Sequence, residues 1–364
     1  MSRQFLISAS LVLLLLQLSC NTNPVEPPAK NPREYTWTID TLAYPGSAQT
    51  LMREIWGSSP TDVYVVGHND NPGVPTMFRF DGKSWKTTGF HAVEGGPIAG
   101  PVSLYSIYGF GLNNVFVVGQ RIYDNPNPPP NFLDSSLIIQ YDGSRWREHR
   151  VVGRFLHAIW GNDPQNIWVS GEEGSLFHYN GQSWTKESIP VSPPPGSYYK
   201  LYGIGGTSPT DLYLLASAHE DPLIRTTFYF LRRNVSGWAV IDTFINQPGM
   251  NQNKWGDNEL WASPWGTLYS VGAGVFQWNG SSWTKIFSTD EPCTEIFGSS
   301  ENNIFVTGFR SILFHYNGTD WYQYENVRFP NVGYSGIWTN GKEVFLLAHT
   351  LGGFPQKTLI LNGK

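Results

Sequence analysis

One repeated stretch limits what this chain of 364 residues can fold into. Its best copy, from Ala158 to Ser188, has the sequence AIWGNDPQNIWVSGEEGSLFHYNGQSWTKES. Four short apolar runs alternate there with turn sequences, and the third and fourth runs are separated by Asn180-Gly181. Asn-Gly between two alternating runs is a strong hairpin signal, because both central residues of a type I′ turn need positive φ. Each copy therefore predicts four short antiparallel strands.

Seven copies of this stretch follow one another from near residue 50 to the C-terminus. Each first strand ends at an equivalent residue, namely Gly57, Gly109, Gly161, Gly206, Ala262, Gly298 and Thr339. Successive positions in this series are 36 to 56 residues apart, which indicates loops of variable length inserted into a constant core. Self-similarity at such a period is the sequence signature of a repeat architecture.

The fourth strand of each of the first six copies contains a tryptophan, and the last copy lacks that strand. These tryptophans are Trp85, Trp146, Trp184, Trp238, Trp283 and Trp321. The seventh copy ends at the C-terminus directly after its Asn-Gly turn, while a matching Trp strand occurs at residues 35–38. The sequence thus predicts an all-β, seven-bladed β-propeller of four-stranded antiparallel blades, whose last blade is closed by the N-terminal strand. A right-handed solenoid is the alternative, but it gives no reason for a last strand at the first residues.

The blades resemble those of exported bacterial β-propellers with the pattern IWG-x4-DVW-x-VG followed by Y[DN]G-x2-W. The resemblance covers about residues 35 to 364. A more distant likeness connects the turn to kelch repeats and to the Asp-box of sialidases, although Asp and Gly are adjacent here. The arginine cluster with acidic and tyrosine partners that a sialidase site needs is not recognisable in the sequence. Because one fold hosts many activities, the resemblance implies blade architecture and not a reaction.

The N-terminus has the features of a lipoprotein signal. Residues 1–19 combine Arg3 with an apolar run of secretory length, and Ser19 precedes Cys20. We expect cleavage before Cys20 and acylation of its thiol and amine, and two acyl chains hold a protein stably on a membrane. An ordinary signal peptide cut nearby is the alternative. Residues 20–34 are rich in Pro and Asn and predict a disordered tether, followed by a single domain at 35–364.

These features predict export to the cell envelope, at the outer membrane or the surface in preference to the cytoplasmic membrane. The leaflet and the oligomeric state are left open. A net charge of −5 gives no indication of a positively charged surface that would bind nucleic acid. Of the two cysteines, Cys293 takes a position that Met52 and Leu156 occupy in other copies, so a buried hydrophobe is the expected role.

The chain shows no catalytic or metal-binding motif, and we expect no cofactor and no metal. Gly-x-Ser-x-Gly, His-Glu-x-x-His, Cys-x-x-Cys and phosphate-binding glycine loops are all missing from the sequence. The carboxylates of residues 171–174 (GEEG) and 219–221 (HED) are expected in solvated turns. An enzyme is therefore less favoured than a binding protein, but it is not ruled out.

The loops place a binding surface on one face of the predicted disc. Strands one and two, and strands three and four, are joined by short turns, whereas the long loops all lie at the other ends of the strands. Near that face, one position of the first strand is large, polar and different in each copy. In the first five copies it is Arg53, Tyr105, His157, Tyr202 and Asn258, and Thr294 and Ser335 follow. We expect the first five to bind a ligand at the mouth of a central channel, with the next residue of each strand on the opposite face of the pleat.

Three hypotheses about function remain open at this point. The first is a membrane-anchored, non-catalytic recognition module that binds a glycan or an envelope or extracellular protein through the long-loop face. The second is a glycosidase or lyase that acts on a polysaccharide with loop carboxylates. The third is an adhesin-like spacer without a defined pocket. The sequence does not identify the ligand.

Overall fold

The computed structural model describes residues 30–364, apart from 72–73, 89–92, 95–100, 209 and 222–224. Across this part of the chain the regular structure is β-strand, with two 3-10 segments, η1 (Pro32–Glu34) and η2 (Phe309–Ser311), and no α-helix. The all-β prediction is therefore confirmed. Cys20 and the expected signal segment lie outside the described residues. Among the residues that the structure describes, no helix is long and apolar enough to span a membrane.

Each repeat copy forms an antiparallel group of four strands, which we call a blade and number by its copy. The first three blades consist of β2 (Thr50–Ser59), β3 (Asp62–Asn69), β4 (Met77–Phe80) and β5 (Trp85–Thr87); β7 (Val102–Gly109), β8 (Val115–Asp124), β9 (Phe132–Tyr141) and β10 (Trp146–His149); and β11 (Arg154–Asp163), β12 (Asn166–Glu172), β13 (Leu176–Tyr179) and β14 (Trp184–Lys186). A short strand, β6 (Val93–Glu94), adds in parallel to β10. The prediction of four-stranded antiparallel sheets is confirmed.

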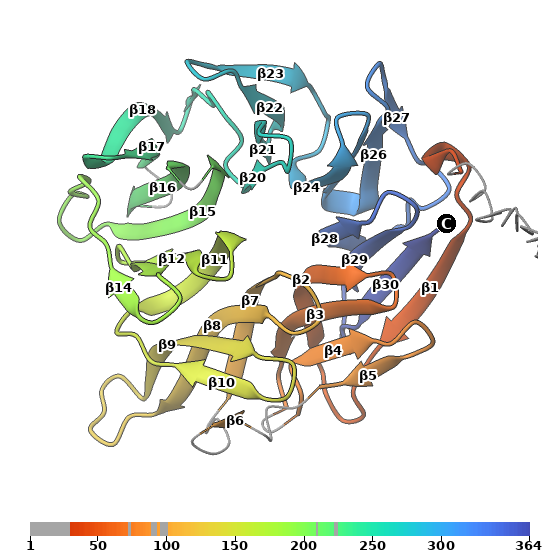
Figure 1. Ribbon diagram of the computed structural model, residues 1–364, viewed down its shortest axis with the longest axis horizontal. Helices are drawn as coiled ribbons and strands as arrows, with labels where there is room; N and C mark the ends of the chain where they lie inside the picture. The colour runs from red at the N-terminus through yellow and green to blue at the C-terminus, as the bar shows by residue number, and fades with distance from the viewer. Residues whose placement is uncertain (1–29, 72–73, 89–92, 95–100, 209, 222–224) are drawn as a thin grey trace, which may run out of the picture.

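The remaining blades repeat this order. They consist of β15 (Tyr198–Ser208), β16 (Asp211–Asp221), β17 (Arg225–Asn234) and β18 (Gly237–Gln247), extended by β19 (Met250–Asn251); β20 (Glu259–Ala262), β21 (Leu268–Gly272), β22 (Gly274–Trp278) and β23 (Trp283–Phe287); β24 (Cys293–Ser300), β25 (Asn303–Gly308), β26 (Ile312–Tyr316) and β27 (Trp321–Gln323); and β28 (Val332–Thr339), β29 (Val344–Thr350) and β30 (Thr358–Gly363). The blades are arranged around a common axis with their first strands innermost (Figure 1).

The N-terminal strand β1 (Trp37–Leu42) belongs to the same sheet as the last three strands of the chain. It pairs antiparallel with β30, with Trp37 opposite Gly363 and Leu42 opposite Thr358, and it lies on the outside of this sheet (Figure 1). The described end of the expected tether also contacts the domain. Arg33 forms an ion pair of 3.0 Å with Asp320 of blade 6, and the hydroxyl of Tyr324 donates to the carbonyl of Pro32.

The repeated tryptophan packs against the aromatic residue that precedes the Asn-Gly or Asp-Gly turn. In blade 3, for example, Trp184 lies opposite Tyr179 in the strand register, with 5.0 Å between the ring centroids. Hydrophobic clusters also extend from one blade to the next: Trp85 of blade 1 packs with Phe345 and Ile360 of the last blade. The tryptophans therefore stabilise the contacts between sheets, as large buried aromatic surfaces do.

A β-bulge interrupts the first strand at the same place in six of the repeat copies. The register shifts fall between Met52 and Glu54, Leu104 and Ser106, Leu156 and Ala158, Leu201 and Gly203, Cys293 and Glu295, and Tyr334 and Gly336. A bulge places two residues of one strand against one residue of its partner and redirects their side chains. The middle residue of each pair belongs to the series that the sequence analysis selected, which includes Arg53.

A small residue of the second strand lies opposite this bulge, namely Gly67 and Gly119 in blades 1 and 2 and Ala216 and Ala348 in blades 4 and 7. A Cβ atom on Gly67 would lie 2.2 Å from the carbonyl oxygen of Leu51, and one on Gly119 would lie 2.1 Å from that of Ser103. No side chain fits at such distances without displacement of the backbone. The Val-Val-Gly sequence of the second strand in blades 1 and 2 is thus the sequence counterpart of the bulge opposite it.

Candidate functional site

The first strands of the blades enclose a cavity of about 360 Å³. Short turns join the ends of the first strands to the second strands, so the starts of the first strands face the long loops. The cavity wall includes all five residues predicted to lie at the channel mouth, namely Arg53, Tyr105, His157, Tyr202 and Asn258. The structure therefore brings these five residues together, whereas their role in binding stays a prediction.

The next residue of each strand lines the same cavity, although pleat alternation predicted that it would face away. This second set consists of Glu54, Ser106, Ala158, Gly203, Glu259 and Glu295. In the bulged strands the extra residue breaks the alternation, so two consecutive side chains point to the axis. The assignment of the two sets to opposite faces was wrong for this physical reason. As a result the cavity contains carboxyl groups that the predicted site lacked.

A cation and three aromatic rings form one side of the wall. The guanidinium carbon of Arg53 lies 4.2 Å from the ring centroid of Tyr105. The ring of Tyr105 contacts His157 edge to face at 5.2 Å, and Phe155 stacks on His157 at 6.2 Å. The Nη1 atom of Arg53 is buried and has no hydrogen-bond partner among the described residues. This side of the cavity thus presents a guanidinium group that lies over a tyrosine ring and has an N–H donor free for a ligand.

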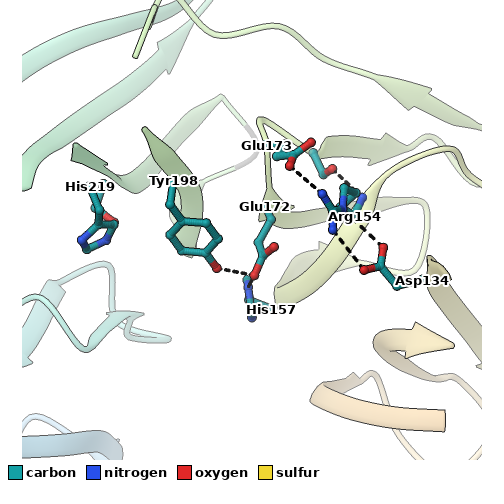
Figure 2. Close-up of polar contacts among 9 residues, drawn as sticks. Asp134, Arg154, His157, Glu172, Glu173, Tyr198 and His219 are labelled. Carbon is teal, nitrogen blue, oxygen red and sulfur yellow. Dashed lines mark hydrogen bonds and ion pairs between the residues drawn. The ribbon is translucent and has the colours of Figure 1, made fainter. Parts of the chain in front are cut away.

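Glu172 lies at the junction of blades 3 and 4 and joins two members of the site (Figure 2). One oxygen, Oε1, accepts a hydrogen bond from the hydroxyl of Tyr198 and lies 3.3 Å from Nε2 of His157. Glu172 is only 8 % exposed, so it is not the solvated turn carboxylate that its GEEG sequence predicted. Burial lowers the pKa of His157, and the neighbouring Glu172 carboxylate partly opposes that shift.

The backbone holds this junction together. Lys200 of β15 pairs with Glu172 of β12, and the amide of Glu173 donates to the carbonyl of Tyr199 at 2.8 Å. These bonds merge blades 3 and 4 into one continuous sheet, which the repeat pattern did not predict. The ammonium of Lys200 lies 5.4 Å from the ring centroid of Tyr202, and burial lowers its pKa.

The outer edge of this region is an exposed ion-pair network (Figure 2). Arg154 pairs with Asp134 at 3.1 Å and with Glu173 at 2.7 Å. Glu173 of this network and Phe155, which follows Arg154 in the chain, have positive φ values of 50° and 28°. Such backbone conformations are costly for residues other than glycine and persist only when the surroundings fix them. The network and the pairing of blades 3 and 4 supply that constraint.

Three carboxyl groups from blades 1, 5 and 6 line the same cavity. Burial raises the pKa of Glu54, Glu259 and Glu295, and repulsion from neighbouring carboxylates raises the pKa of Glu54 and Glu295 further. The carboxyls of Glu259 and Glu295 are hydrogen-bonded to each other. Like charges in a confined space repel one another, so these groups ionise less readily than free carboxyl groups. In the described part of the chain no group of three His, Cys, Asp or Glu residues is arranged to hold a metal ion.

Some residues of the site were not among those selected from the sequence. Phe155, Glu172, Tyr198 and Lys200 take part because blades 3 and 4 meet there. No periodic signal marks them, since the other copies have no equivalent contact. Asn258, in contrast, was selected but is exposed, and its Nδ2 donates to the carbonyl of Cys293 at 2.6 Å. Cys293 itself is fully buried, in agreement with the expected hydrophobic role.

The comparison with solved structures identifies the fold. Among 317 matching chains is a structure described as YCF48 bound to D1 peptide, with a TM-score of 0.55 and 14% identity over 92% of this chain and 97% of that chain. The fold is a β-propeller. YCF48 from Cyanidioschyzon merolae gives a TM-score of 0.55 and 11% identity over 89% of this chain and 98% of that chain. The WD40 β-propeller domain of Doa1 gives a TM-score of 0.52 and 10% identity over 90% of this chain and 97% of that chain.

At such low identity these likenesses show the propeller architecture alone. No protein-family model and no curated protein matches the chain. The function must therefore be argued from the site.

Proposed function

We propose that this chain is an exported, seven-bladed β-propeller that serves as a non-catalytic recognition module. It binds a segment of another envelope or extracellular protein at the long-loop end of the central cavity. The observation on which this rests is the wall formed by Arg53, Tyr105 and His157, in which a buried guanidinium nitrogen has no partner. Buried polar groups are normally hydrogen-bonded, so an unpaired donor in a cavity favours a ligand that supplies the acceptor.

A closed ring of seven blades is part of this proposal. Its support is the pairing of β1 with β30 over six residues from Trp37 to Leu42. Because the first strand of the last blade, β28, also packs against β2 and β24 of its two neighbours, the chain ends meet within one assembly. A closed ring leaves only short, protected sheet edges and holds the wall residues of different blades at fixed distances.

A protein ligand is favoured over a glycan because the related fold of YCF48 has a structure with a bound peptide. The wall also suits a peptide: rings for apolar and aromatic groups, and donors and acceptors for amides. We propose in addition that Cys20 is lipidated and holds the domain at the outer membrane or the cell surface, with residues 21–29 as part of a tether. The apolar run of residues 1–19 and the Ser19-Cys20 junction support this anchor.

The experiment that tests the recognition function is affinity capture from detergent-solubilised envelope of the source cells. Wild-type protein and Arg53→Gln are immobilised in parallel, and cross-linked partner peptides are identified by mass spectrometry. We expect a protein that is retained by the wild type, lost with Arg53→Gln, and cross-linked near the cavity. A glycan array run beside it separates the two ligand classes. Selective retention of a glycan without any protein would refute the protein-binding function.

A second candidate, a polysaccharide glycosidase or lyase, is favoured by the buried carboxylate of Glu172 between Tyr198 and His157. A carboxylate, an imidazole and a phenol are the groups that acid-base catalysis uses. Its test is the release of new chain ends from a panel of envelope polysaccharides. Cleavage that is abolished by Glu172→Gln would establish this function in place of the first.

A further inference from the structure

The charges of the cavity indicate which ligand group the site takes. Most arginines in the described part of the chain have a carboxylate partner: Arg79, for example, lies 2.6 Å from Asp62, and Arg232 lies 2.6 Å from Asp211. Arg53 differs, because no described carboxylate lies within ion-pair distance of its guanidinium and its Nη1 is buried. Arg53 is half-buried, and a buried donor atom without a partner leaves a hydrogen bond for a ligand to supply.

A second cation, Lys200, comes from blade 4; burial lowers its pKa, and the carboxylates of Asp257 and Glu172 partly oppose that shift. Lys200 is partly buried against Tyr202, and among the described residues it has no carboxylate within ion-pair distance. The positive charges of both Arg53 and Lys200 act on the imidazole of His157, where each disfavours protonation. The ring of Tyr105 lies beneath the guanidinium of Arg53.

From this arrangement we propose that the group recognised is a single carboxylate, supplied by an acidic side chain or a chain end, which binds to the guanidinium of Arg53. Guanidinium groups bind carboxylates through two parallel N–H donors, and the contact with Tyr105 fixes the orientation of the donors in advance. That a peptide carries this carboxylate rests on the proposed function. The preference of the site for a carboxylate group does not depend on it.

The acidic part of the cavity explains why a carboxylate fits better than a phosphate. Glu54 directly follows Arg53 in the strand, and Glu54, Glu259 and Glu295 line the same cavity. A phosphate group with up to two negative charges would meet stronger repulsion from these groups than a carboxylate with one. The carboxyls thus set an upper limit on the negative charge that the cavity accepts.

The test is a fluorescence anisotropy titration with four labelled probes in low salt. The probes are the capped peptides (Glu-Gly)4 and (Gln-Gly)4, an oligogalacturonate of eight units, and the same oligosaccharide with its carboxyls reduced. The proteins are the wild type, Arg53→Gln, Lys200→Gln and the control Arg232→Gln, which removes an arginine from a tyrosine ring at the far ends of the strands. Thermal melting of each variant shows that it is folded.

We expect (Glu-Gly)4 to bind and (Gln-Gly)4 to bind at least about tenfold more weakly, since a charge-assisted contact is lost. Arg53→Gln should reduce the affinity for (Glu-Gly)4 at least about tenfold, Lys200→Gln by a smaller factor, and Arg232→Gln should leave it unchanged. Equal binding of both peptides would overturn the inference while the protein-binding function stands. Binding of the oligogalacturonate alone, with the same dependence on Arg53, would support the carboxylate and refute the peptide. No binding of any probe would overturn the inference.

Discussion

The hydroxyl of Tyr198 in blade 4 donates a hydrogen bond to Oε1 of Glu172 in blade 3, across the only place where the described sheets merge into one. Glu172 is buried, and the same oxygen lies 3.3 Å from His157. A side-chain contact between blades thereby positions a residue of the cavity wall.

Tyr198→Phe removes this hydrogen bond and leaves a buried carboxylate with one partner fewer. We expect the free energy of unfolding to fall by about 1.5–3 kcal/mol, the range for hydrogen bonds to charged groups. Urea denaturation at pH 7 measures the change. The matched control is Tyr322→Phe, because the hydroxyl of Tyr322 has no hydrogen bond among the described residues and its ring is half-exposed. Equal losses in both variants would show that the Glu172 contact contributes nothing.

The carboxyls of the cavity predict that stability falls as the pH rises. Burial, followed by repulsion from Glu259, raises the pKa of Glu54 to about 8. A carboxyl whose pKa is higher in the folded state binds more protons there, so stability is greatest below the unfolded pKa near 4.5 and decreases until the pH passes about 8.

Glu54→Gln should remove part of this dependence, since Glu259 and Glu295 also have raised pKa values. Glutamine keeps an acceptor for the amide of Ile55, which donates to Glu54 Oε1 at 2.9 Å. Melting temperatures measured from pH 5 to 9 should converge at acid pH and separate at alkaline pH, with the variant the more stable. If the melting temperatures of the wild type and of Glu54→Gln changed with pH in parallel, the raised pKa of Glu54 would be contradicted. The surface substitution Glu325→Gln serves as the control, because its side chain is 70% exposed.

The N-terminal strand should be essential to stability. Trp37 contacts Tyr324 at 5.7 Å and packs against the cluster that includes Leu361 and Tyr334. Trp37→Ala should cost about 3–5 kcal/mol, the range for truncation of a large aromatic side chain in a core. Ile39→Ala, at a half-exposed position of the same strand, should cost less than about 1 kcal/mol. Similar losses in urea denaturation would argue against closure of the ring by β1.

The bulge predicts an effect at a residue far from any ligand. Gly119→Ala should destabilise the protein by about 2–4 kcal/mol or prevent folding, because the new methyl group would lie 2.1 Å from the carbonyl oxygen of Ser103. Gly353→Ala is the control, since no atom lies within 4 Å of its Cβ position. Thermal melting compares the two. An unchanged melting temperature for Gly119→Ala would mean that the strand pairs without the bulge.

Lipidation is testable independently of the domain. Wild-type protein expressed in a bacterial host should incorporate labelled palmitate and partition into the detergent phase, and Cys20→Ser should do neither. Cys293→Ser is the control, because that thiol is buried in the folded domain. Absence of label from the wild type would rule out the anchor.

The sequence by itself determined the repeat, the strand order of each blade and the relation between the two chain ends. Local chemistry was sufficient for this: Asn180-Gly181 and its equivalents fix the hairpins, and Trp184 and its equivalents mark the outer strand. It also selected Arg53, Tyr105, His157 and Tyr202, because these residues vary at a position where the rest of the repeat is constant.

Only the tertiary structure decided what surrounds these residues. The bulge turns Arg53 and Glu54 toward one cavity. Sequence alternation assumes that successive side chains of a strand point to opposite faces, so it does not account for an extra residue in one strand. The glycine opposite the bulge was visible in the sequence. The reason that no side chain fits there is the nearby carbonyl group of another strand, which only the structure shows.

The burial of Glu172 depended on blade 4 as well. Its carboxylate is covered because Tyr198 and Lys200 come from the next repeat and pair with it there. Such contacts arise between segments that the repeat pattern treats as independent, so their energy is decided by packing and not by the local sequence.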